Sequence, residues 1–429
     1  MFCSAISWLR YTQLSKRACK KIRKRACKRA YKSVFVLPPT PENIWILGEL
    51  LRAGFNVAFA TETVYGLGGN IFDQKAINRI YKIKGRPSTN PVIVHVPDVG
   101  SIYKHDLTRM TPNEQHVFEA LVGHFSPGPI TWVVRANTDV VSEQIRNNSR
   151  FVGIRIPNHP IALALLTSAG VPIAAPSANP SGGVSPTTPD HVLKDYEERK
   201  KLFMPILGDI PEDRGKCVGL ESTIAKIEEV KDENGVSTIV ITILRAGAIG
   251  TEQIEEFLVT LGAKGTFGAK GTFGDALPLQ WTIETYVRSV NEESSDAPGQ
   301  LLKHYSPQTQ THIAKKSEES VFSGDKKEAV LVASAAMIVK YGTEYAHTFE
   351  LADTVEGCAN QLYDVMRTAD AYAQHHNLAA ILICIDDICQ GASTEGSGLV
   401  AASTEGSGLV AALKDKLFRA SSGKEPLRI

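Results

Sequence analysis

The chain has 429 residues, of which 43% are hydrophobic and 22% are charged, with a formal net charge of +1. This composition is typical of folded domains, the length leaves room for two or three of them, and no apolar run approaches the roughly 18 residues that cross a bilayer, so no membrane association is expected. Residues 1–33 hold 11 of the 47 Lys and Arg and none of the 46 Asp and Glu, so the remainder is acidic, which argues against a dedicated nucleic-acid-binding protein.

Residues 1–36 are predicted to be a basic extension that is either disordered or a targeting sequence. The near-repeat of Lys16–Lys20 in Lys24–Lys28 favours low complexity, while the density of Lys and Arg also suits an organelle transit peptide, a nuclear address or weak contact with RNA. Seven cysteines without a Cys-x-x-Cys spacing predict free thiols in a reducing compartment and no zinc site. We therefore expect a cytoplasmic protein, with a mitochondrial or nuclear location as the open alternative.

Residues 37–261 alternate between short apolar runs and helical patterns, which predicts an α/β domain whose strands need not all be parallel. The expected strands cover 57–60, 92–96, 130–134, 171–175 and 239–244, and the expected helices cover 75–84, 111–122 and 188–200.

Residues 262–325 are rich in Gly, Thr, Ser and Pro and are predicted to be an interdomain linker. They include a perfect hexamer duplication, Gly262–Phe267 copied as Gly268–Phe273. A smaller α/β domain is expected over 326–429, with strands at 329–339 and 378–385 and helices at 359–375 and 409–420. The duplication of Ala392–Ala401 as Ala402–Ala411 reads as a surface-loop expansion, because the entropy cost of closing a loop rises slowly with its length.

The segment 175–187 carries the chemistry of an anion-binding loop directly after an apolar run. Hydroxyl and amide side chains such as Ser177 and Ser185 can donate to oxyanions, and Gly182 and Gly183 permit the positive φ angles that turn successive amides inward. The loop lacks the Gly-x-x-x-x-Gly-Lys pattern of a P-loop, and taken alone it equally suits an ordinary polar turn.

Further motifs stand in a fixed order around this loop. They are Thr61–Gly68, Lys84–Pro87 with Asn90 and Pro91, Ser126–Thr131, Arg155–Pro157, Gly219–Ile224, Leu244–Gly247 and Pro298–Pro307. Together they resemble the YrdC-domain family of threonylcarbamoyl-AMP synthases, in the long form with a C-terminal α/β domain, over roughly two thirds of the chain. The resemblance implies a YrdC-like twisted open mixed sheet with helices, plus a smaller C-terminal Rossmann-like α/β domain.

The resemblance also implies a nucleotidyltransferase reaction. In this family L-threonine, bicarbonate and ATP form threonylcarbamoyl-AMP and pyrophosphate, and downstream tRNA threonylcarbamoyl-transfer enzymes use the product. Mg²⁺ is expected to arrive with ATP, without a dedicated metal site in the protein. Glu62 and Glu221 are the acids that could hold it through water or orient the basic groups, and structural pairing is the equal alternative.

The resemblance assigns roles to individual side chains. The catalytic candidates are Lys84 and Arg86; the ATP contacts are Arg86, Asn90, Thr131, Ser177, Ser185, Arg245 and Tyr305; the threonine contacts are Thr63, His95, Arg135, Ala175 and Ser222. Arginine grips phosphate with a planar fork and lysine supplies a compact charge, although both also suit a solvated helix end. A lone histidine in an apolar strand is often only half-buried structure, and an arginine at a strand end is often a surface residue.

The sequence departs from the family pattern at three places within these motifs. Ala246 replaces a proline, Ser126 replaces an aromatic residue, and 300–302 lack the family's methionine, basic residue and aromatic. Two other functions stay open on the sequence: a carbamoyl-adenylate-forming enzyme that uses carbamoyl phosphate, and a non-catalytic RNA-binding YrdC module. The absence of acylphosphatase or zinc-finger segments argues against the first, and the acidic body argues against the second.

Overall fold

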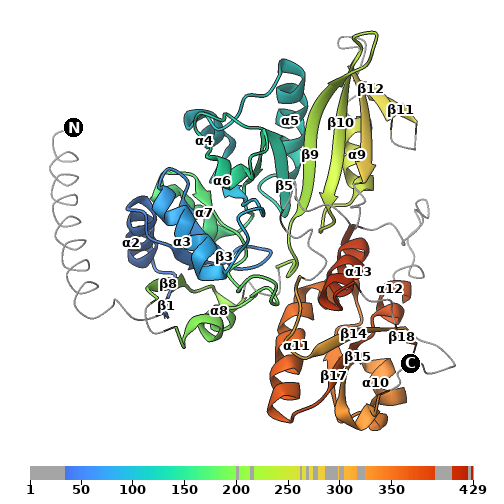
Figure 1. Cartoon of the computed structure of the whole chain (residues 1–429). Coiled ribbons are helices and arrows are strands. Elements are labelled where there is room, and N and C mark those ends of the chain that lie inside the picture. The colour runs from blue at the N-terminus through green and yellow to red at the C-terminus, as the bar shows by residue number, and fades with distance from the viewer. Residues whose placement is uncertain are drawn as a thin grey trace.

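The computed structural model describes residues 34–199, 202–212, 217–260, 263–266, 270–273, 279–285, 298, 304–315, 324–391, 408–423 and 427–428. The basic extension up to Ser33 and residues 392–407 of the second duplication therefore lie outside the described part. Within these ranges no helix has the length and hydropathy needed to cross a membrane. The chain forms two halves, each built on its own sheet (Figure 1).

The first half is built on a mixed sheet with the strand order β1-β8-β2-β3-β7-β4-β6-β5-β9-β10-β13-β12-β11. Its strands are β1 (Val34–Leu37), β2 (Val57–Phe59), β3 (Gly66–Asn70), β4 (Val94–His95), β5 (Ile130–Arg135), β6 (Phe151–Arg155), β7 (Ile173–Ala174), β8 (Met204–Leu207), β9 (Thr223–Lys231), β10 (Ser237–Arg245), β11 (Ala263–Thr266), β12 (Lys270–Phe273) and β13 (Leu279–Thr285). Parallel pairs such as β5 with β9 alternate with antiparallel ones such as β5 with β6.

Helices cover this sheet because each carries an apolar stripe. They are α2 (Pro41–Arg52), α3 (Gln74–Lys84), α4 (Val99–Lys104), α5 (Pro112–Phe125), α6 (Glu143–Arg146), α7 (Pro160–Ala169), α8 (Pro189–Tyr196) and α9 (Thr251–Thr260). In α2, Leu47 and Leu51 are one helical turn apart and pack with Leu165 of α7 against Phe59 of β2. Every strand and helix expected over 37–261 is present, although β4 and β7 are shorter than the apolar runs that predict them.

The second half has a parallel sheet with the order β16-β15-β17-β14-β18. Its elements are β14 (Gln310–Lys315), β15 (Ala329–Ser334), α10 (Ala335–Tyr341), β16 (His347–Leu351), α11 (Val355–His375), β17 (Ala380–Ile383), α12 (Asp386–Gly391), α13 (Gly408–Ala420) and β18 (Leu427–Arg428). The predicted fold class, a twisted mixed sheet plus a smaller parallel α/β unit, is confirmed.

Two boundaries differ from the sequence prediction. The strand expected over 329–339 ends at Ser334, because the Ser334 side chain caps α10 by accepting a hydrogen bond from the Met337 amide at 3.3 Å. The range 262–325 also contains regular structure: β11, β12 and β13 extend the first sheet, and β14 belongs to the second. Residues 263–266 and 270–273 of the duplicated hexamer form the antiparallel strand pair β11 and β12 within the range predicted to be a linker.

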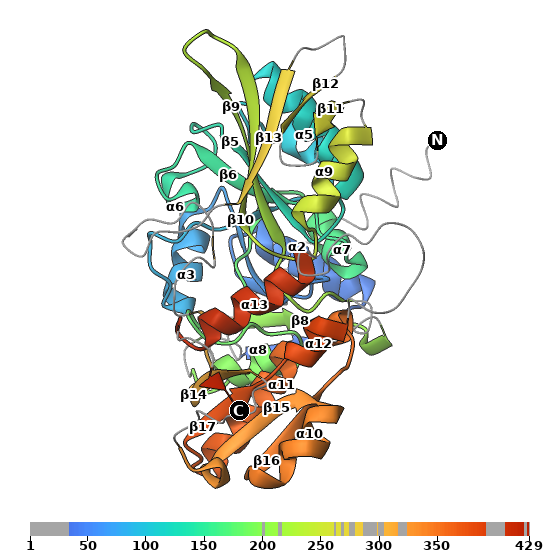
Figure 2. The ribbon, with the colours of Figure 1, turned by 90° about the vertical axis from the view of Figure 1, so that its right-hand side faces the viewer.

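The two halves meet along α11 and α13 (Figure 2). One apolar cluster joins Val64, Val184 and Leu220 of the first half to Leu362 of α11 and Val410 of α13. At the start of α13, Gly408 lies so close to Gly250 that a Cβ on either residue would clash with backbone atoms of the other. The second half therefore packs directly on the loops that carry the sequence motifs.

Candidate active site

The predicted anion-binding loop follows β7 and lies beside the Thr61–Gly68 motif. Backbone bonds join them: the Leu67 amide donates to the Pro176 carbonyl, and the Tyr65 amide donates to the Pro186 carbonyl, each at 2.8 Å. Gly182 has a φ of +85°, which glycine adopts without steric cost. Two motifs that are far apart in the sequence thus form one wall of the site.

Lys84 holds this loop from the end of α3. Its Nζ donates to the Ser177 carbonyl at 2.6 Å and also to the Asn179 carbonyl, and the side chain is buried. Burial and the neighbouring Arg86 lower the pKa of Lys84 well below its ordinary value. Gly85 ends α3 with a left-handed φ of +63°, which turns the chain so that Arg86 follows on the same side.

Arg86 and Asn90 contact each other. Arg86 Nη2 donates to Asn90 Oδ1 at 2.5 Å and to the Pro91 carbonyl at 2.7 Å. Burial lowers the pKa of Arg86 to about 10, with Tyr81 and Tyr305 opposing the shift and Arg245 adding to it. The guanidinium therefore stays charged at neutral pH inside the protein, where a charge acts on a ligand more strongly than it does in water.

Thr131, Ser222 and Arg245 form a second group on the ends of three strands. The Thr131 and Ser222 hydroxyl oxygens are 2.8 Å apart, and Arg245 Nη2 donates to the Ser222 carbonyl at 2.9 Å and to its hydroxyl at 3.1 Å. Arg245 Nη1 also donates to the Pro298 carbonyl at 3.2 Å.

His304 and Tyr305 are both buried over these groups. The pKa of His304 lies well below its ordinary value, first because of burial and then because of Arg86, Lys84, Arg245 and Lys416. We call these four positive side chains the central cluster. Tyr305 has a φ of +59°, a strained angle for a non-glycine residue, and the ammonium of Lys416 lies 5.2 Å from the centre of its ring.

Ser185 of the anion loop is fully buried and bonded to an acid. Its Oγ donates to Glu221 Oε1 at 2.5 Å. The structure thus places the predicted catalytic and ATP-binding residues, and the predicted threonine contact Ser222, on neighbouring loops and strand ends. The catalytic and ATP-binding residues are Lys84, Arg86, Asn90, Thr131, Ser177, Ser185, Arg245 and Tyr305. A concentration of positive charge beside hydroxyl-bearing loops is suited to a polyphosphate.

A second polar group lies next to the central cluster. His95 and Arg155 are paired in register on β4 and β6, and Arg155 Nη2 lies 2.9 Å from Glu62 Oε1. All three side chains are buried, and Arg155 Nε has no hydrogen-bond partner among the described residues. Burial and Arg155 lower the pKa of His95 to about 3, so its ring is neutral at pH 7.

The other predicted threonine contacts differ in position. Thr63 follows Glu62, with its hydroxyl 2.9 Å from that of Thr61, and the Ala175 amide donates to the Ile93 carbonyl near β4. Arg135 is not brought to this group: its Nε donates to Glu114 Oε1 at 2.7 Å. It stands four residues along β5 from Thr131, roughly 13 Å away at the usual rise of a strand.

Arg155 is the buried arginine that the residue-by-residue prediction left out. The signal for it was the motif Arg155–Pro157, which the sequence shows at the end of an apolar run. Arg155 and Arg135 both end a strand, and the sequence does not tell which end of the sheet each occupies.

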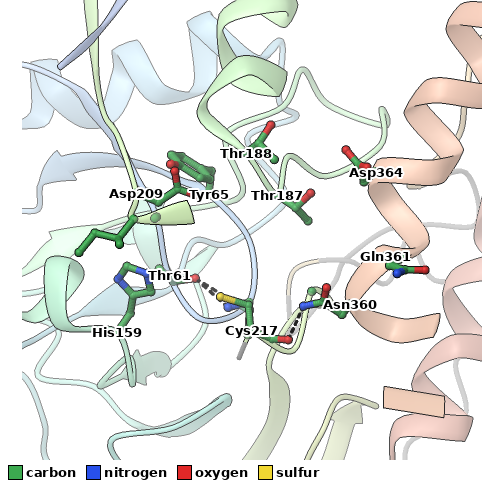
Figure 3. A pocket seen from close by; sticks show the side chains of 14 residues that line it. Thr61, Tyr65, His159, Thr187, Thr188, Asp209, Cys217, Asn360, Gln361 and Asp364 are labelled. Atoms are coloured by element: carbon green, nitrogen blue, oxygen red, sulfur yellow. Dashed lines mark hydrogen bonds between the residues drawn. The ribbon is translucent and has the colours of Figure 1, made fainter. Parts of the chain in front are cut away.

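A cavity of about 210 Å³ opens between the halves next to Thr63 (Figure 3). The first half lines it with Thr61, Thr187 and His159, among others, and α11 adds Asn360, Gln361 and Asp364. Asn360 Nδ2 donates to the Cys217 carbonyl at 2.6 Å across this boundary. Both halves of the chain therefore contribute walls to the region of the site.

Comparisons with known proteins agree with this architecture. The Sua5/YciO/YrdC family, described as telomere recombination, matches residues 49–247, and the family described as threonylcarbamoyl-AMP synthase, C-terminal domain, matches residues 249–422. The chain is 32% identical over 329 residues to the threonylcarbamoyl-AMP synthase of Bacillus subtilis, which covers 75% of this chain and 82% of the relative. It is 31% identical over 338 residues to that of Pyrococcus abyssi, which covers 76% of this chain and 85% of the relative.

Among solved structures, the crystal structure of P. abyssi Sua5 complexed with L-threonine matches with a TM-score of 0.67 and 28% identity, over 92% of this chain and 99% of that one. The chain therefore belongs to the threonylcarbamoyl-AMP synthase family. It is an enzyme of the nucleotidyltransferase type, as the sequence predicts, and the comparisons do not support the two alternative functions.

Proposed function

We propose that this chain joins L-threonine, bicarbonate and ATP into threonylcarbamoyl-AMP, releases pyrophosphate, and passes the product to enzymes that modify tRNA. The observation that carries the proposal is the central cluster. Its four basic side chains lie close enough to the buried His304 to lower the pKa of that residue, and hydroxyl-rich loops lie beside them. The binding of L-threonine in the structure of the P. abyssi relative supports the choice of amino acid.

The reaction needs orientation and charge neutralisation and no protein nucleophile. The neutral threonine amine reacts with bicarbonate to form a carbamate, with release of water. A carbamate oxygen then attacks the α-phosphorus of ATP. The bond to the bridging oxygen breaks and pyrophosphate leaves with the electron pair. Arg86 and Arg245 are positioned by their backbone and side-chain acceptors to stabilise negative charge that grows on the phosphates.

We assign the threonine pocket to Thr63, His95 and Arg155. Arg155 can donate from Nε to the substrate carboxylate, because that donor is buried and unused by the described residues. His95 contributes a neutral ring that can hydrogen-bond without adding charge. The antiparallel pairing of β5 with β6 places Arg155 beside Thr131, so amino acid and nucleotide would meet there.

Mg²⁺ would reach the site with ATP, neutralising the charge on its phosphates. Glu62 lies against Arg155 and Glu221 accepts from two hydroxyls, which favours structural pairing as the role of these two acids. The protein's own part is then to hold the phosphates with its arginines.

The test is release of pyrophosphate from ATP by the purified full chain. Release should require both L-threonine and bicarbonate, and L-serine should be a poorer substrate, because a methyl group in a fitted pocket contributes roughly 1–3 kcal/mol of discrimination. Equal turnover with carbamoyl phosphate and no amino acid would instead support the carbamoyl-adenylate alternative. Binding of RNA without any pyrophosphate release would support the non-catalytic one.

A further inference from the structure

A tyrosine of the second half contacts the proposed nucleotide site. Tyr363 of α11 is fully buried, and its hydroxyl donates to Glu221 Oε2 at 2.6 Å. Glu221 lies on the loop before β9, in the first half. The bond crosses the boundary between the two sheets and joins residues that are 142 positions apart in the sequence.

Glu221 connects this tyrosine to the anion loop. Its other oxygen, Oε1, accepts from Ser185 Oγ at 2.5 Å, so the carboxylate receives one hydroxyl from each half of the protein. Burial and the Glu221 charge raise the pKa of Tyr363 well above its ordinary value, so its hydroxyl keeps its proton and remains a donor. Glu221 is buried, and loss of either donor would leave a carboxylate oxygen with a costly unmet bond.

A second residue of α11 holds the same loop one helical turn away. Arg367 donates to the Val184 carbonyl and to the Ser185 carbonyl at 3.3 Å, and it forms a two-point ion pair with Asp195 at 2.8 and 2.9 Å. Tyr363 and Arg367 are four residues apart and share one helix face. The backbone of Ser185 is thus held by Arg367, and its side chain is oriented by Tyr363 through Glu221.

Tyr363 also packs against the residue that covers the site. Its ring stacks on that of Tyr305, with centroids 5.7 Å apart and planes 25° from parallel. Phenylalanine would keep this stack and remove the hydroxyl alone, which separates a packing role from a role in orienting Glu221.

We propose that Tyr363 is a positioning residue for ATP, acting through Glu221 on Ser185. The inference rests on the proposed role of Ser185 in nucleotide binding. It gives the C-terminal half a defined part in the reaction: Tyr363 of α11 sets the geometry of the loop that receives the nucleotide.

The experiment compares steady-state kinetics of full-length Tyr363→Phe, Glu221→Gln, Ser185→Ala and the double variant Tyr363→Phe/Glu221→Gln with the native chain. We expect Tyr363→Phe to raise the KM for ATP about tenfold, the effect of losing one hydrogen bond to a charged group, while the KM for L-threonine changes less than about twofold. The double variant should be no worse than Glu221→Gln, because the tyrosine acts through that acid. Tyr372→Phe is the matched control, since Tyr372 lies on the same helix but stacks on His347 within the second half.

The outcomes separate the inference from the function on which it rests. If Ser185→Ala leaves the KM for ATP unchanged, the nucleotide role of Ser185 is wrong and the inference goes with it. If Ser185→Ala and Glu221→Gln raise that KM but Tyr363→Phe does not, the inference alone is overturned. Additive effects in the double variant, or equal changes in both KM values, would also overturn it by showing a general structural role.

Discussion

The protein has two clusters of basic side chains, the central cluster and a second cluster on the first sheet, and they differ in what balances their charge. In the paired cluster, Arg135, Arg150 and Lys226 surround the Phe151 ring at 5.7, 5.2 and 5.1 Å. Each of these cations forms an ion pair with a carboxylate: Glu114 pairs with Arg135, and Glu228 pairs with both Arg150 and Lys226. This cluster is complete without a ligand.

In the central cluster the partners are mostly neutral. Lys84 donates to two backbone carbonyls, Arg86 to Asn90 and the Pro91 carbonyl, and Arg245 to Ser222, while Lys416 has Asp415 at 3.1 Å. Lys84, Arg86 and Arg245 thus have no acidic partner among these contacts, and Arg86, with a pKa of about 10, stays charged at neutral pH. A buried charge of this kind is expensive without an opposite charge, so its persistence indicates an anionic ligand.

The largest expected effect follows from removing a cation of the central cluster. Arg86→Ala should lower kcat/KM for ATP roughly 30- to 1,000-fold, the equivalent of about 2–4 kcal/mol of transition-state stabilisation. Arg86→Lys should recover only part of this loss, because lysine lacks the planar fork. Arg150→Ala, which removes an exposed cation of the paired cluster, is the control in the same pyrophosphate assay. Normal turnover by Arg86→Ala would end the distinction between the clusters.

The next largest effect is expected on the KM for L-threonine when one of the two strand-end arginines, Arg155, is replaced. Arg155→Gln should raise the KM for L-threonine roughly 10- to 100-fold, the loss of a charge-assisted contact, and should leave the KM for ATP nearly unchanged. Arg135→Gln should change neither constant by more than about twofold. The reverse result would restore Arg135 to the threonine pocket.

Arg135 should instead matter for stability. Arg135→Ala leaves the buried Glu114 carboxylate without its ion pair, which should lower the free energy of unfolding by about 1–3 kcal/mol, measured by urea denaturation. Activity measured well below the midpoint of denaturation should stay within about twofold of the native chain. A stable but inactive Arg135→Ala protein would contradict this assignment.

As the pH falls, the histidines of the site should reduce the free energy of unfolding at a higher pH than the paired cluster does. The pKa of His95 is lowered to about 3, so below the ordinary histidine pKa near 6.5 the unfolded chain binds more protons than the folded one. The free energy of unfolding should therefore fall by up to about 1.4 kcal/mol per pH unit for this residue as the pH drops from roughly 6.5. His304 acts in the same direction, since its pKa is also lowered.

The paired cluster has its dependence in a lower pH window. Burial would raise the pKa of Glu228, but Lys226 and Arg150 outweigh it and the pKa is lowered. Its contribution is present above the ordinary glutamate pKa near 4.3 and is lost only below that value. Urea denaturation at about pH 7.5, 6 and 5 should show the loss, and His95→Asn should flatten it. An unchanged slope in that variant would assign the loss to other groups.

The basic extension should have the smallest effect of all. Removal of residues 1–33 should leave threonine-dependent turnover unchanged, because no family motif lies there. Fluorescent fusions of the full and shortened chains test separately whether the extension changes the location of the protein in the cell. A loss of turnover would give this third group of cations a role in the reaction.

The sequence predicts most of the central cluster because its motifs are short and local. Lys84 is the last residue of α3, and Arg86 and Asn90 follow shortly after it, so their order in the chain nearly determines their neighbourhood. Arg135 and Arg155 could not be separated in this way. β5 and β6 are antiparallel, with Trp132 opposite Ile154, so the last residues of the two strands stand at opposite ends of the pair. Only the register shows that Arg155 lies at the Thr131 end.

Contacts between the halves were beyond reach of the sequence for a related reason. Tyr363 and Lys416 occur in amphipathic helices, where a tyrosine or lysine needs no special explanation. Their significance comes from packing against Glu221, Tyr305 and the loops of the other half. Similarly, a glycine-rich repeat carries little strand signal, because its strands are specified by their pairing and not by an apolar face.

The strand pair formed by the copied hexamer has a consequence for how this chain can lengthen. Its register is symmetric about Gly265 and Gly271, and Lys264 opposes Thr272 just as Lys270 opposes Thr266. Each copy thus brings its own hydrogen-bonding partner, so an in-frame duplication at this outer edge adds a strand without disturbing the strands inward of it. A third copy could pair with β11 in the same register as β12 does. This outer edge of the sheet can therefore gain a strand by repetition of the hexamer.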